Sequence, residues 1–199
     1  MARARRGAAA HGDEIRRSMV EAARNLTALG LNRGASGNIG VRLGDTFLIT
    51  PSGLPATDLT PQSMVELDFD GQVVAGAKPS SEWRMHRDIL RARAGVGAVV
   101  HTHSCYATTL ACLRRDVPAF HYMIAAAGGD SIRCAPYALF GTQELSDAAL
   151  HSLRGRKACL LGNHGMIALG GNLEDALAPF VIDNVVRLRN RFKVVVIRG

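Results

Sequence analysis

Four side chains in the sequence form a set that could bind zinc, and three of them are histidines. His101 and His103 are separated by one residue and follow a short apolar run. Because residues two apart face the same side of a strand, both imidazoles can converge on one point. His164 lies in a glycine-flanked turn, and Glu82 follows a pair of serines. Taken singly, each residue also has an ordinary explanation. His101 and His103 could be hydrogen-bonded core or surface histidines, and His164 could be an ordinary turn residue. Glu82 could simply offset a helix dipole. Together they make a complete set of nitrogen and oxygen ligands for zinc.

Three short polar loops have the composition of a phosphate site. Each combines hydroxyl or amide side chains with accessible backbone N–H groups, and the last stands at a predicted helix N-terminus, where anions are stabilised. Each loop could equally be a turn or a cap. The residues are Ser36, Gly37, Asn38, Ser52, Gly53, Ser80 and Ser81. The sequence has no P-loop and no complete G-x-G-x-x-G fingerprint, so it does not support nucleotide binding.

The elements that must position these residues mix helices with hairpins. Helical spacing of apolar residues and capping signals predict helices over 14–29, 80–93, 104–114, 120–127 and 142–155, and a last helix from Asn172. Strands are predicted over 38–43, 46–50, 65–69, 72–74, 96–100, 131–135, 157–161 and 166–169. Without a regular βαβ alternation, this order predicts a layered α/β fold whose central, mostly antiparallel sheet is flanked by helices.

Length and composition indicate one globular domain. The chain has 199 residues, of which 47% are hydrophobic and 21% are charged, values typical of a folded domain with its own core. We expect a flexible basic N-terminal arm over residues 1–12 and a single domain over 13–199. Four cysteines form no C-x-x-C unit, so we expect reduced thiols rather than a disulfide framework.

The formal net charge of +7 does not by itself indicate a nucleic-acid partner. Several positive charges lie in the N-terminal arm, the others are dispersed, and aromatic residues make up 5% of the chain. A groove for single strands needs basic residues interleaved with stacking aromatics, so we expect no nucleic-acid binding. There is no apolar run of about 20 residues and no export signal behind Arg5 and Arg6. We therefore expect a cytoplasmic protein without membrane contact.

The same motifs resemble the zinc-dependent class II aldolases of the fuculose-phosphate type. They occur in the same order and with compatible spacing over about residues 14–177. The matching motifs are Ser36-Gly37-Asn38, Thr50-Pro51-Ser52-Gly53, the run 79–83, His101-Thr102-His103, the run 121–129 and Asn163-His164-Gly165. The resemblance implies a class II aldolase-like fold and reversible cleavage of L-fuculose 1-phosphate, or a close ketose 1-phosphate, to dihydroxyacetone phosphate and L-lactaldehyde.

The resemblance also implies roles for individual residues. His101, His103, His164 and Glu82 would bind one Zn²⁺ per subunit, and Glu82 would be a ligand of the resting enzyme that leaves the metal and becomes the catalytic base. The seven residues of the polar loops would bind the substrate phosphate. The family forms homotetramers with active sites between subunits, and Tyr122 of the adjacent subunit would exchange a proton with the aldehyde oxygen.

Three features depart from the family pattern. Ser36 stands beside a position at which the fuculose enzymes often carry the threonine of a Thr-Ala pair. Pro179 falls inside the predicted last helix, where it would break or kink that helix. After Arg191 the chain ends in an apolar segment instead of the usual helix and polar tail.

Three related readings remain open. Aldolases for 5-deoxyribulose or methylthioribulose 1-phosphate share the phosphate-bearing half of the substrate, so metal and phosphate residues do not discriminate them. Pentulose-phosphate 4-epimerases share the fold and the His-Thr-His run, but they carry Asp where Glu82 stands and lack the His-Tyr-Met segment. The adducin head domain is a non-catalytic scaffold, which has no reason to keep the ligands and Tyr122 together.

Overall fold

The computed structural model describes residues 2–180 of the chain. The helices are α1 (Ala2–Ala28), α2 (Trp83–Ala92), α3 (Cys105–Cys112), α4 (Gln143–Ser152) and α5 (Leu173–Leu177), with short 3-10 helices η1 (Pro61–Ser63), η2 (Tyr122–Ala127) and η3 (Ala178–Phe180). The strands are β1 (Asn38–Leu43), β2 (Thr46–Ile49), β3 (Val65–Asp68), β4 (Val73–Ala75), β5 (Ala98–Thr102), β6 (Arg133–Ala135), β7 (Ala158–Leu161) and β8 (Gly165–Gly170).

Within residues 2–180, the eight strands form one sheet in the order β4-β3-β2-β1-β5-β8-β7-β6. All neighbours are antiparallel except β6 and β7, which confirms the predicted mostly antiparallel sheet. A two-residue turn joins β1 to β2, and its first residue, Gly44, has φ +59°. A type II′ hairpin turn requires glycine at this position, so the order Gly-Asp fits the turn.

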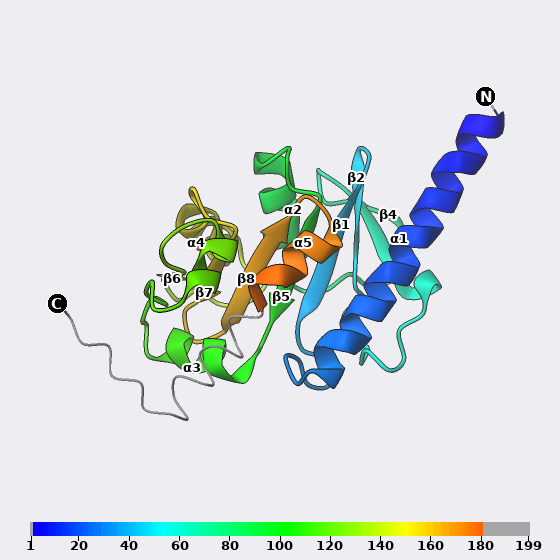
Figure 1. The fold of residues 1–199 in the computed structure, drawn as a ribbon. Helices are drawn as coiled ribbons and strands as arrows, with labels where there is room; N and C mark the ends of the chain where they lie inside the picture. Colours follow the sequence, from blue (N-terminus) through cyan, green and yellow to red (C-terminus); the bar gives the residue numbers. More distant parts are fainter. Residues whose placement is uncertain (1, 181–199) are drawn as a thin grey trace.

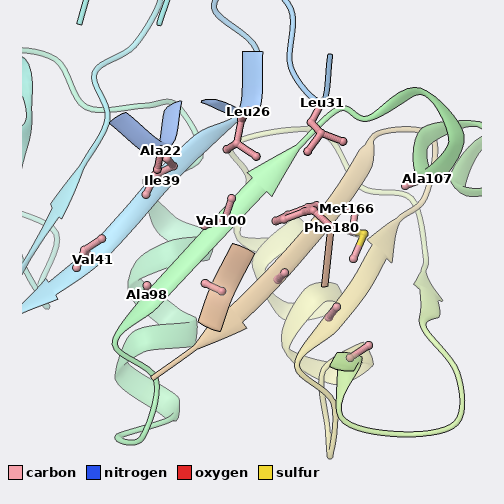
Figure 2. Close-up of a cluster of buried hydrophobic side chains, with 14 of the residues drawn as sticks. Ala22, Leu26, Leu31, Ile39, Val41, Ala98, Val100, Ala107, Met166 and Phe180 are labelled. Carbon is pink, nitrogen blue, oxygen red and sulfur yellow. The ribbon is translucent and has the colours of Figure 1, made fainter. Parts of the chain in front are cut away.

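Helices cover both faces of the sheet (Figure 1). A first core cluster joins α1, α3 and α5 to one face, and Leu26, Val100 and Met166 are among its members (Figure 2). A second cluster joins α2 and α4 to the other face through residues such as Ile89 and Leu145. Full burial of each such side chain contributes about 1.5–3 kcal/mol. The two clusters therefore fix the sheet between its helical layers.

Asp88 links the two helices of the second layer. Its carboxylate accepts hydrogen bonds of 2.7 Å from Gln143 Nε2 and Ser146 Oγ of α4 and from the neighbouring Arg87 Nε. Burial alone would raise the pKa of Asp88, but these hydrogen bonds outweigh it and the pKa is lowered. The ionised carboxylate thus anchors α2, the helix that begins directly after Glu82.

Several element boundaries differ from the sequence prediction. Helix α1 begins at Ala2 rather than near residue 14, because the alanines and arginines there favour a helix, and its N-terminal part projects past the sheet (Figure 1). Strand β5 starts two residues late and continues through Thr102. Helix α5 ends before Pro179, which lies in the 3-10 turn η3, as expected of a residue without an N–H. The atypical segment after Arg191 lies outside the described residues.

The chain's division into an arm over residues 1–12 and a domain over 13–199 stays a prediction. Among residues 2–180, no helix is both long enough and apolar enough to cross a lipid bilayer.

Candidate active site

Strand register brings the first histidine to the site. Asn38 of β1 lies opposite His101 of β5, and β8 runs along the other side of β5. The buried His101 ring places Nδ1 at 3.0 Å from the carbonyl oxygen of Met166. Because a carbonyl only accepts hydrogen bonds, Nδ1 carries the proton and the Nε2 lone pair is free to bind a metal.

All four predicted metal ligands converge. His101 Nε2 lies 2.9 Å from His103 Nε2 and 3.3 Å from Glu82 Oε2, and Glu82 Oε1 lies 3.4 Å from His164 Nε2. The four ligand atoms all lie within 4.8 Å of one another. Tetrahedral zinc with bonds of about 2.0–2.1 Å separates its ligand atoms by about 3.3 Å. The observed spacing therefore fits such an ion.

The protonation states of the cluster suit a metal. Burial lowers the pKa of His101 to about 3, and burial with the neighbouring His164 also lowers the pKa of His103. Burial alone would raise the pKa of Glu82, but attraction to His101 and His164 outweighs it, and the pKa is lowered. Neutral imidazoles and a carboxylate are the forms that ligate metals.

One atom of the cluster lacks a partner that a metal would supply. Glu82 Oε1 is buried and accepts no hydrogen bond within residues 2–180. A buried, unsatisfied charged oxygen is costly. The donor set and this oxygen together show that the residues fit a divalent metal.

Glycine is required where β8 approaches β5. A Cβ at Gly165 would overlap the carbonyl oxygen of Thr102 and lie 3.1 Å from His101 Cε1. The preceding Asn163 adopts a left-handed backbone with φ +56°, and its Oδ1 accepts a 3.1 Å hydrogen bond from Arg114 Nε. The turn therefore aims His164 into the cluster while the two strands stay in contact.

A cavity of about 350 Å³ opens beside the metal ligands. Two of its loops run side by side, because Ser80 N donates to the Thr50 carbonyl and Ser52 N donates to the Lys78 carbonyl, both at 3.0 Å. The structure brings all seven predicted phosphate residues into the lining of this one cavity. They are Ser36, Gly37, Asn38, Ser52, Gly53, Ser80 and Ser81, and they line it together with Glu82, His103 and His164.

The Ser36 hydroxyl is already engaged within its own loop. Its Oγ donates to the Arg33 carbonyl at 2.7 Å and accepts from the Arg33 backbone N–H at 3.0 Å. This residue therefore closes a turn, and a ligand in the cavity would have to compete for its hydroxyl.

Sequence reasoning missed residues that support or line the site. Asn32 is buried, and its Oδ1 accepts a 3.0 Å hydrogen bond from the backbone N–H of His103. Tyr137 and Phe140 line the cavity while remaining more than half exposed. Asn32 follows soon after a helix-ending glycine and has the pattern of a turn residue, so the sequence gave no reason to select it. Tyr137 and Phe140 could have been selected only as two aromatic residues close together in the sequence.

Tyr122 lies outside the lining of this cavity. It occupies η2, and its side chain is 80% exposed. Its expected role was in the site of an adjacent subunit, so that role stays a prediction.

Comparison with known proteins identifies the family. Residues 17–184 match the family model described as Class II Aldolase and Adducin N-terminal domain. The 5-methylthioribulose-1-phosphate/5-deoxyribulose-1-phosphate aldolase of Rhodospirillum rubrum is 57% identical over 163 residues, which cover 82% of this chain and 74% of that protein. The L-fuculose phosphate aldolase of Escherichia coli strain K12 is 48% identical over 165 residues, 83% of this chain and 77% of that protein. A solved structure of L-fuculose 1-phosphate aldolase superimposes with a TM-score of 0.85 at 36% identity, covering 94% of this chain and 91% of that one. The chain belongs to the class II aldolase family.

Proposed function

We propose that the protein is a zinc-dependent lyase that cleaves a ketose 1-phosphate to dihydroxyacetone phosphate and an aldehyde. The observation that carries the proposal is the cavity in which Glu82, His103 and His164 meet the three polar loops. A phosphate held by the loops would place the first carbons of a sugar beside the metal ligands. A non-catalytic scaffold would not need this combination.

The residues divide the work of the reaction. Asn38, Ser52 and the backbone N–H groups of Gly53 and Ser81 would hold the phosphate. A metal held by the three histidines, with Glu82 as a fourth ligand that leaves it when substrate binds, would act as a Lewis acid against the negative charge that develops on the substrate oxygens. Cleavage of the C3–C4 bond moves one proton from the C4 hydroxyl to C3. In the reverse condensation the Glu82 carboxylate, the form that its lowered pKa favours, would take the proton from C3, and in cleavage the protonated Glu82 would return that proton to C3.

Tyr122, in the site of a neighbouring subunit of a homotetramer, would donate its phenol proton to the aldehyde oxygen in condensation, and the resulting phenolate would take the proton back from the C4 hydroxyl in cleavage. The exposure of its ring supports this assignment. Co-expression of Glu82→Gln and Tyr122→Phe chains tests it, because mixed tetramers would then contain intact sites at about a quarter of positions. Activity should return in the mixed tetramers although each pure variant is inactive. No recovery in verified mixed tetramers would refute a shared site.

Three sugar phosphates compete as the substrate. The relative at 57% identity favours 5-methylthioribulose or 5-deoxyribulose 1-phosphate, and the relative at 48% identity favours L-fuculose 1-phosphate. Tyr137 and Phe140 add aromatic surface to the cavity, which suits an aldehyde half with an apolar methyl or methylthio end. Each of these substrates would release dihydroxyacetone phosphate.

The test is release of dihydroxyacetone phosphate from the three sugars, measured by a coupled assay. The protein is first treated with a chelator and then reconstituted with zinc. We expect about one zinc per subunit and release that disappears and returns with the metal. Zinc-loaded protein that cleaves none of the sugars would contradict the proposed reaction, and protein that fails to bind zinc would contradict the metal assignment.

A further inference from the structure

A buried chain of hydrogen bonds runs from His86 through Asn38 to Glu82. Glu82 caps the N-terminus of α2 and His86 lies four positions later in its first turns, so the two side chains face the same side. Asn38 Nδ2 donates to Glu82 Oε2 at 2.8 Å, and Asn38 Oδ1 is hydrogen-bonded to His86 Nε2. Glu82 is 5%, Asn38 7% and His86 0% exposed. The chain is thus buried, with Asn38 and Glu82 at its edge in the lining of the cavity.

The chemistry of the three groups fixes where the protons lie. A carboxylate oxygen only accepts hydrogen bonds, so the amide N–H of Asn38 must face Glu82. The amide oxygen then faces His86 and also only accepts, so Nε2 of His86 must carry a proton. His86 Nδ1 is buried and has no hydrogen-bond partner within residues 2–180. Burial lowers the pKa of His86 to about 4, so the ring is neutral near pH 7.

The backbone beside the ring is shaped for this arrangement. A Cβ at Gly40 of β1 would lie 2.6 Å from His86 Nδ1, so only glycine lets the imidazole pack against the strand. Asn38 lies two residues before Gly40 and faces the same side of β1. The strand thus presents the amide to the ring without a competing side chain.

A flipped Asn38 amide would turn its oxygen toward the Glu82 carboxylate. Two negatively polarised oxygens in a buried site repel each other, and Glu82 would lose a charge-assisted hydrogen bond. Asn38 also lines the cavity beside the phosphate loops. Its orientation therefore affects both the base and the pocket.

We propose that His86 is a positioning residue that donates from Nε2 to Asn38 and so locks the amide with its N–H toward Glu82. The effect of His86 on catalysis rests on the proposed function, since Glu82 would be the group that moves the substrate proton. The tautomer itself does not depend on that function.

The first experiment reads the tautomer in the metal-free protein. ¹⁵N-histidine labelling and long-range ¹H–¹⁵N spectra at pH 7 distinguish the two nitrogens of each ring, and His86→Gln identifies the His86 signals. We expect a neutral ring with the proton on Nε2. A proton on Nδ1, or a doubly protonated ring, would overturn the proposal.

The second experiment separates a donor effect from a packing effect in the zinc-loaded enzyme. His86→Gln keeps an N–H donor, whereas His86→Leu has none. We expect His86→Leu to lower kcat by about tenfold or more with a smaller change in KM, and His86→Gln to recover most of the loss. Equal kcat in two variants with wild-type circular dichroism would refute the lock.

The two experiments keep the failures apart. If wild-type protein cleaves none of the sugars, the proposed function fails while the spectra still decide the tautomer. If His86→Leu does not fold, His86→Gln and the spectra decide the proposal, because His86→Gln must then retain most of the wild-type kcat.

Discussion

Glycine is needed at position 37 for two reasons, its left-handed backbone and the lack of space for a Cβ. Substitutions at two glycines of this loop can separate these reasons. Its φ is +74°, and a Cβ there would lie 2.5 Å from Asn32 Oδ1. Gly34 in the same loop has φ +58° but nothing within 4 Å of its Cβ position. Gly34→Ala therefore tests backbone strain alone, whereas Gly37→Ala adds a collision with a buried amide.

The expected magnitudes follow from these two terms. A left-handed conformation costs a non-glycine residue about 1–2 kcal/mol. The collision at Gly37 also displaces Asn32 from the His103 backbone N–H, and a hydrogen bond lost with one partner left unpaired costs about 1–3 kcal/mol. We expect the free energy of unfolding to fall by about 1–2 kcal/mol in Gly34→Ala and by about 2–5 kcal/mol in Gly37→Ala.

The two variants should also differ in metal binding. Displacing the partner of His103 loosens a metal ligand, and loss of such outer contacts typically weakens affinity about 10–100-fold. Urea denaturation of the metal-free protein measures stability, and competition with a chromophoric chelator measures zinc affinity. Equal destabilisation by both substitutions, with unchanged zinc affinity, would refute the reasoning.

A double-mutant cycle isolates the collision itself. Asn32→Ala removes the amide that the new Cβ would strike. Asn32→Ala combined with Gly37→Ala should therefore destabilise by less than the sum of the single changes. Strict additivity would mean that Gly37 is needed for its backbone alone.

Three further predictions concern other parts of the chain. His103→Ala should abolish zinc binding while the fold is retained. His151 is exposed on α4, so the control His151→Ala should change neither zinc binding nor the fold. Metal analysis measures the zinc content, and bound zinc in His103→Ala would contradict the ligand assignment. The lowered pKa of Asp88 means that its stabilisation is present above its unfolded-state pKa and is lost as pH falls through its folded-state pKa. Asp88→Asn should cost about 1–3 kcal/mol at pH 7 and flatten the acid side of the stability curve measured by urea denaturation; an unchanged pH dependence would count against it. Burial raises the pKa of the Cys159 thiol, so iodoacetamide should label the exposed Cys105 and leave Cys159 unmodified until denaturant is added. Mass spectrometry measures the labelling, and modification of Cys159 in the folded protein would contradict the prediction.

The parts of the site that depend on local geometry could be predicted from sequence. The two-residue period of extended backbone is enough to place His101 of β5 and His103, directly after the strand, on one side. Short loops with glycine next to hydroxyl residues similarly signalled the walls of the cavity. These predictions needed no knowledge of what packs against each segment.

The parts that depend on distant packing could not be predicted. Asn32 acts on His103 across 71 positions of sequence, and no spacing rule connects them. His86 lies on the buried face of α2, where a histidine has the pattern of an ordinary core residue. Its importance depends on the asparagine that β1 places opposite it. Helix α1 also begins earlier than predicted, because apolar periodicity marks only the part that packs on the sheet.

The strand register of β5 also determines which ring nitrogen of His101 carries the proton. Alternation along β5 sends Val100 to the first core cluster and Val99 to the second, and His101 lies two residues after Val99 on the same side of the strand. A slip of one residue would exchange the faces of both valines and would also take His101 Nδ1 from the Met166 carbonyl. The apolar core that specifies the register therefore also selects the tautomer that leaves Nε2 free. A core substitution that shifts this register should therefore also weaken metal binding.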